Sequence, residues 1–101
     1  MDIEMVHHIV LWNLKEELND RERKEAAARI REKLMAVREA AEGIISLEVV
    51  TEGLPSGNKD LGLISVFESA EALEAYQQHP AHVEAACYIK EVTCDRVCLD
   101  Y

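Results

Sequence analysis

Several features that mark other classes of protein are missing from this chain. It has no basic cluster, and 20 acidic residues against 11 Lys and Arg give a formal net charge of −9. Such a surface repels phosphate backbones and anionic lipids, which argues against binding to nucleic acid or to a membrane surface. No apolar run approaches the roughly 20 residues that a membrane-spanning helix needs. Residues 1–4 include two acids, the wrong sign for a signal peptide.

Cysteine is scarce, and its arrangement argues against both disulfides and zinc. Cys87, Cys94 and Cys98 are odd in number and lack the Cys-x-x-Cys spacing of zinc and redox sites. On one strand, Cys94 and Cys98 would lie about 13 Å apart, too far for a disulfide. We therefore expect three free thiols and a reducing compartment, the cytoplasm.

What is present describes an ordinary globular chain. Its 101 residues, of which 49% are hydrophobic and 31% charged, suit a single domain over residues 1–101 and argue against disorder. We find no internal repeat, low-complexity tract or linker. A domain of this length buries only about 65% of its unfolded surface, so a core shared with a second copy would help it.

Two segments predict strands that are apolar on both faces. Residues 5–14 are rich in β-formers and contain neither glycine nor proline. Alternation places one set on one face (Val6, His8, Val10, Trp12, Leu14) and the other set on the opposite face (Met5, His7, Ile9, Leu11, Asn13). The strand predicted at residues 60–68 also lacks a charged row on either face. Both faces of such a sheet must therefore be covered.

The remaining elements follow from helix signals and turn residues. Residues 21–42 predict a helix that Asn19 or Asp20 caps, with an apolar stripe of Ala26, Ile30, Leu34, Val37 and Ala41. Further strands are expected at 44–51 and 93–99. A second helix should begin at Ala70 behind the cap Ser69 and falter at His79, before Pro80 opens a new helical turn.

The order strand, helix, strand, strand, helix, strand predicts an α+β, ferredoxin-like βαββαβ fold with a four-stranded antiparallel sheet. Two helices cover only one face of that sheet. The other apolar face needs a partner, and a second copy of the chain is the simplest one. A homodimer is therefore expected.

The candidate chemistry gathers in residues 76–83, which hold Tyr76, His79, Pro80 and His82. An imidazole titrates near neutral pH, which suits His82 to general-base work beside the Tyr76 phenol. Six residues apart on a continuous helix, the two side chains would point about 120° apart, so the break at Pro80 must bring them together. His8, on the first strand, is the third candidate.

Three stretches resemble the stress-responsive dimeric α/β-barrel (Dabb) family: residues 8–15, 63–69 and 76–83, followed by the final Asp100-Tyr101. The resemblance implies two ferredoxin-like subunits whose sheets close into a barrel, with a cavity in each subunit. A polyketide cyclase of this family uses a tyrosine and a histidine from the same motif, which implies Tyr76 and His82 here, with His8 nearby. The flanking residues differ from those of that enzyme.

Each candidate also has a plainer interpretation. His79 and His82 suit the capping of a kinked helix, and His8 suits a buried histidine with one hydrogen-bond partner. Beyond the three catalytic candidates, we expect Trp12, Phe67 and His79 to contact a ligand, although the aromatic residues also suit the core. A metal site from His8, His79 and His82 lacks a fourth ligand, so no metal or cofactor is expected.

Two functions of different classes remain open. The first is a cofactor-independent, cyclase- or lyase-like protein that binds a small organic molecule in an apolar pocket. The second is a structural or stress-protective oligomer whose histidines only stabilise the fold.

Overall fold

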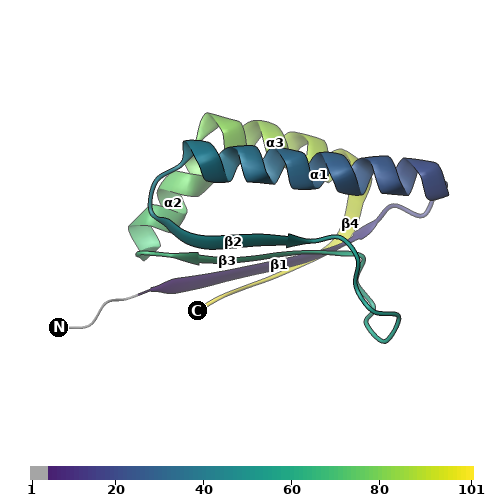
Figure 1. The fold of residues 1–101 in the computed structure, drawn as a ribbon, viewed down its shortest axis with the longest axis horizontal. Coiled ribbons are helices and arrows are strands. Elements are labelled where there is room, and N and C mark those ends of the chain that lie inside the picture. Colours follow the sequence, from purple (N-terminus) through teal and green to yellow (C-terminus); the bar gives the residue numbers. More distant parts are fainter. Residues whose placement is uncertain (1–4) are drawn as a thin grey trace.

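The structure, a computed structural model, describes residues 5–101 as a four-stranded antiparallel sheet with all its helices on one face (Figure 1). The elements are β1 (Val6–Leu14), α1 (Asp20–Ala40), β2 (Ile44–Val50), β3 (Leu61–Phe67), α2 (Ala70–Gln78), α3 (Pro80–Val92) and β4 (Thr93–Asp100). The strand order β2-β3-β1-β4 is that of a ferredoxin-like fold, as predicted. Residues 1–4, used above against a signal peptide, lie outside the described residues.

Helix α1 begins and ends close to where the sequence predicts. Asn19 and Glu22 form a reciprocal capping box at its start. The predicted stripe is buried from Ala26 to Val37, which turns one side of the helix toward the sheet. After the helix, Gly43 takes a φ of +82°, and a Cβ there would lie 2.7 Å from the Cβ of Ala72, so the turn into β2 requires glycine.

The second helical segment is two helices, and the sequence prediction of its last part was incomplete. The Ser69 side chain caps α2 by accepting from the Ala72 N–H, as expected. The chain then becomes extended at His79 (φ −61°, ψ 134°), and Pro80 opens α3. Where the sequence predicted only a helical turn, α3 runs for 13 residues to Val92. It carries Ala85 and Ile89 into the core, and this packing lets the helix continue.

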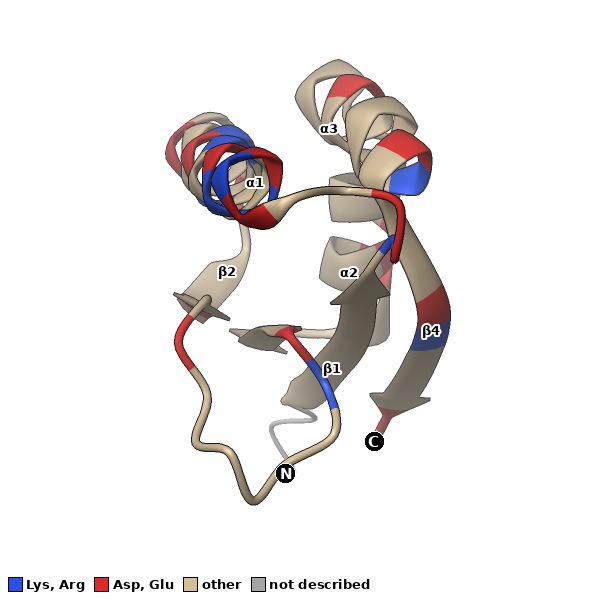
Figure 2. Cartoon of the chain, turned by 90° about the vertical axis from the view of Figure 1, so that its right-hand side faces the viewer, with Lys and Arg blue, Asp and Glu red and all other residues tan. Residues whose placement is uncertain are grey.

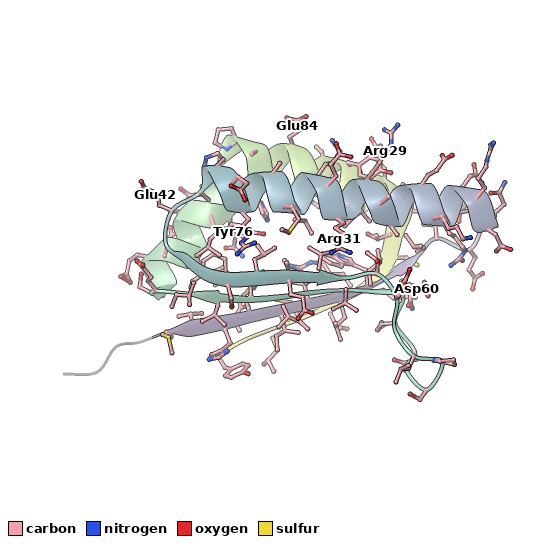
Figure 3. All side chains as sticks on the ribbon, viewed as in Figure 1. Arg29, Arg31, Glu42, Asp60, Tyr76 and Glu84 are labelled. Atoms are coloured by element: carbon pink, nitrogen blue, oxygen red, sulfur yellow. The ribbon has the colours of Figure 1, made fainter. Side chains whose placement is uncertain are left out.

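The two faces of the sheet differ sharply. The inner face of β1 and β3 packs under the helices and forms the core with residues such as Val10, Trp12, Leu63 and Phe67. Among residues 5–101, no segment covers the outer face (Figures 1 and 3). Several of its large apolar side chains are exposed: Met5, Ile64, Val97, Leu99 and Tyr101.

The charges lie mainly on the other side of the molecule. Figure 2 shows acidic and basic residues gathered along α1, while the strands are mostly free of charge. The three cysteines are free thiols. Within residues 5–101, no helix has the length and apolar character that crossing a membrane requires.

Candidate functional site

A cavity of about 390 Å³ lies between the helices and the inner face of the sheet. Six apolar residues line it: Val10, Trp12, Leu34, Leu63, Ala86 and Ile89. Its polar lining consists of His8, Gln77, His82, Lys90 and Arg96. A wider groove of about 930 Å³ beside the loop at 51–60 contains none of the four histidines. Apolar walls with a few convergent polar groups are typical of a small-molecule site, and of these two cavities the first combines them with the candidate residues His8, Trp12 and His82.

The helix break brings Tyr76 and His82 together. Their ring centroids lie 4.6 Å apart with the planes at 61°, an edge-on contact. Tyr76 also packs on Phe67 at 4.9 Å and is fully buried in the layer between helices and sheet (Figure 3). In a continuous helix these two side chains would diverge; with the break at Pro80 their rings are in contact, and of the two only His82 lines the cavity.

Both side chains present a buried polar atom that nothing among residues 5–101 satisfies. The Tyr76 hydroxyl and the His82 Nδ1 are buried without a hydrogen-bond partner. Buried polar groups are nearly always paired, and each unpaired one costs about 1–3 kcal/mol. The two orphaned atoms belong to rings in contact, beside a cavity that His82 lines.

Burial sets the protonation states of the pair. It raises the pKa of Tyr76 to about 12, so the phenol keeps its proton and can donate it in a hydrogen bond. It lowers the pKa of His82 below the usual 6.5; a hydrogen bond between the imidazole and the backbone of Gln77 opposes this shift, and the charges of His8, Arg96 and His79 add to it. At neutral pH the site therefore offers a neutral imidazole that can accept a proton beside a phenol that can donate one.

His8 is held in place at the other side of the site. The strand register pairs it with Asp100 on β4, and its Nδ1 hydrogen-bonds the Asp100 carboxylate. Because a carboxylate accepts, His8 carries a proton on Nδ1 and donates it to Asp100. The Ser65 hydroxyl donates to the His8 carbonyl at 3.0 Å, and the ring sits 6.5 Å from that of Tyr76.

The lowered pKa of His82 predicts a pH-dependent part of the stability. As the pH falls below about 6.5, the His82 imidazole takes up a proton in the unfolded chain before it does so in the folded one. Part of the free energy of unfolding that is present at higher pH is therefore lost. The free energy of unfolding should fall by up to about 1.4 kcal/mol per pH unit while the two states differ by one proton. Urea unfolding between about pH 5 and pH 8 should show a shallower fall for His82→Gln than for the wild-type chain. Equal slopes would contradict the prediction.

Of the three residues expected to contact a ligand, Trp12, Phe67 and His79, only one lines the cavity. Trp12 lines the cavity. Phe67 is fully buried and does not reach the lining; it backs Tyr76 and His8 instead. His79 lies outside the cavity, where its Nδ1 accepts from the Ala81 N–H and caps α3, which is its plainer interpretation. His7 is on the outer face, as alternation predicts, and stacks on Tyr101 at 4.7 Å.

The metal set considered from the sequence is not assembled, since His79 is used as a cap. Among residues 5–101, one other group of donor atoms lies within 4.8 Å: His8, Cys98 and Asp100. Its histidine nitrogen is already bonded to Asp100. Burial and the neighbouring Asp100 raise the pKa of the Cys98 thiol, which keeps it protonated and a poor ligand. This arrangement favours a hydrogen-bonded cluster over a metal site.

Sequence reasoning missed several residues of the site. Asp100 was noted only as part of the chain's ending. Alternation predicts on which face of β4 a residue lies, but not which residue of β1 it pairs with. Gln77, Lys90 and Arg96 were not singled out. Lys90 lies eight residues after His82, so on a helix it points about 80° away from it, within the width of one helix face; this signal became visible only once α3 was known to extend that far.

Comparisons with known proteins agree with the fold. The family model described as Stress Responsive A/B Barrel Domain (Dabb) matches residues 6–101. A dimeric ferredoxin-like protein of unknown function from Bacteroides fragilis superposes with a TM-score of 0.88 at 29% identity, over 96% of this chain and 94% of that one. No match is found among curated proteins.

Two more distant structures share the fold. A Dabb family protein from Mesorhizobium loti has a TM-score of 0.70 at 22% identity, covering 96% of this chain and 94% of its own. A hydroxynitrile lyase from Passiflora edulis has a TM-score of 0.81 at 19% identity, covering 99% and 94%.

Proposed function

The chain belongs to the stress-responsive A/B barrel (Dabb) family, and on that premise we propose that it is a homodimer which binds a small organic molecule in each subunit's cavity. Within the cavity, His82, Tyr76 and His8 transfer protons to or from the bound molecule. No cofactor is needed for this chemistry. The three free thiols support a reducing compartment such as the cytoplasm.

The observation that carries the proposal is the pair of orphaned polar atoms beside the cavity. A ligand hydroxyl group could satisfy both of them, because it can accept from the Tyr76 phenol and donate to the His82 nitrogen, whereas a carbonyl oxygen would satisfy the Tyr76 phenol. The Tyr76 phenol would donate to the ligand oxygen, and the neutral His82 would accept a proton from an O–H or from a C–H next to a carbonyl. The structural match to a hydroxynitrile lyase supports a lyase- or cyclase-like reaction of this kind.

The second part of the proposal is the dimer. The exposed apolar residues of the outer face lie on three adjacent strands, β3, β1 and β4, and charged residues are sparse there. A second copy that packs its own sheet on this face would remove the apolar surface from water. Solved structures of similar proteins are described as dimeric.

A binding experiment tests the cavity. The imidazole and cavity methyl NMR signals should shift when acetophenone or a small phenol is added, and His82→Gln should weaken that response about tenfold or more. The matched control is His79→Asn, which removes an imidazole outside the cavity and keeps a side chain able to cap α3. It should bind as the wild type does. If no phenol or ketone shifts a cavity signal, the non-catalytic, stress-protective oligomer is favoured instead.

A further inference from the structure

The cavity has an unequal distribution of charge along its length. Most of its lining is buried or half-buried and includes His82, whose ring contacts that of Tyr76, whereas the lining residues Lys90 and Arg96 are exposed to solvent. Among residues 5–101, two ion pairs (Arg21–Glu25 and Arg23–Asp60) and the His8–Asp100 contact bring opposite charges or their hydrogen-bond equivalents together, and neither Lys90 nor Arg96 takes part in any of them. In a chain of net charge −9, two unpaired cations on one small cavity are unexpected.

From this arrangement we propose, building on the function proposed above, that the natural ligand carries an anionic group, most simply a carboxylate, which Lys90 and Arg96 receive at the opening of the cavity. The protein as a whole repels anions. Local cations are therefore what allows an anion to enter and what fixes its direction, with the charged end outward and the reacting end at His82.

The neighbouring acids do not neutralise these two cations. Arg96 shares the inner side of β4 with Cys98 and Asp100. The Asp100 carboxylate is held by His8, and burial and Asp100 raise the pKa of the Cys98 thiol; the charge of Arg96 and its hydrogen bond to Cys98 oppose this shift without reversing it, so the thiol does not neutralise Arg96. Arg96 acts on the cavity itself, since its charge contributes to the lowered pKa of His82. A guanidinium in this position suits a carboxylate, to which it can form two parallel hydrogen bonds.

Helix geometry sets the dimensions of the ligand. His82, Ala86 and Lys90 follow one another at four-residue intervals on α3, and all three line the cavity. At a rise of 1.5 Å per residue, the backbone positions of His82 and Lys90 are about 12 Å apart. The flexible Lys90 side chain shortens that span. The cavity volume of about 390 Å³ is at the lower end of ligand sites. A single ring with a carbonyl or hydroxyl group at one end and a carboxylate at the other meets these limits.

The test compares two probes of the same shape, 4-acetylbenzoate and the neutral 4-acetylbenzamide, by NMR titration or calorimetry. We expect the carboxylate to bind the wild-type protein about tenfold more tightly, and added salt to reduce that preference. The double variant Lys90→Gln/Arg96→Gln should lose the preference and keep its affinity for the amide. The control Arg29→Gln removes a cation from α1 that points away from the sheet (Figure 3) and should keep the preference.

The outcomes separate this inference from the function on which it rests. Equal binding of both probes to the wild type, or a preference that survives in the double variant, would overturn the anionic ligand and leave the cavity intact as a binding site. If Arg29→Gln loses the preference equally, the preference is a general effect of the protein's charge, and the inference is overturned as well. Failure of both probes to shift any cavity signal would count against the proposed function and the inference together.

Discussion

Val97→Asp is expected to leave the protein a monomer of 11.4 kDa under conditions in which the wild-type chain has twice that mass. Val97 lies opposite Leu11 on the outer face of the sheet and is 48% exposed in the single chain. In the proposed dimer, twofold symmetry would bury one added carboxylate from each copy in an apolar interface. An unpaired buried charge costs several kcal/mol, so the dimer should weaken at least about a thousandfold. Light scattering over a range of concentrations measures the effect.

The control is the same substitution on the opposite side of the molecule. Val83 is 53% exposed on α3, so Val83→Asp adds the same charge at a similar exposure without touching the outer face. It should stay dimeric. Ile64→Asp, on β3 near the middle of the outer face, should behave as Val97→Asp does. A dimer that tolerates both outer-face substitutions would place the interface elsewhere, and a wild-type chain that stays at 11.4 kDa at every concentration would overturn the dimer itself.

The arrangement of the fold could be predicted from the sequence because local signals agree with one another. Alternation in β1 gives the correct inward and outward sets, since side chains of a strand alternate whatever lies beside it. The caps Asn19 and Ser69 and the break at Pro80 are equally local, and the structure has each of them. The length of α3 was missed because its inward residues, Ala85 and Ile89, are too few to show a strong periodicity.

The site could be predicted only in part, because it depends on pairing between distant segments. The break at Pro80 indicated that Tyr76 and His82 meet, but not that the phenol is fully buried and without a partner. The contact between His8 and Asp100 depends on the register of β1 and β4. That register shifts at an irregularity between Leu11 and Asn13, opposite the stretch of β4 where Asp95 takes a positive φ of 53°. No local pattern specifies such a shift.

Tyr76→Phe is expected to change stability and ligand binding in opposite directions. The substitution removes only the hydroxyl, which is buried and unpaired, while the ring keeps its contacts with Phe67 and His82. Taking away an unsatisfied buried group should raise the free energy of unfolding by about 1–2 kcal/mol. The cavity then loses the donor that a ligand oxygen would use, so the binding of acetophenone should weaken about tenfold. Urea unfolding and NMR titration of the same preparation measure both effects.

Tyr88→Phe provides the matched comparison. Tyr88 is half-buried on α3, where its ring lies 5.4 Å from the Lys33 ammonium and its hydroxyl is not among the buried unpaired atoms. Loss of that hydroxyl should change neither stability nor binding by a comparable amount. If Tyr76→Phe instead destabilises the protein, its hydroxyl is satisfied in solution and the group that carries the proposed function is not available to a ligand. A gain in stability with unchanged binding would show that the phenol is unpaired but takes no part in ligand binding, and would contradict its role in the proposed function.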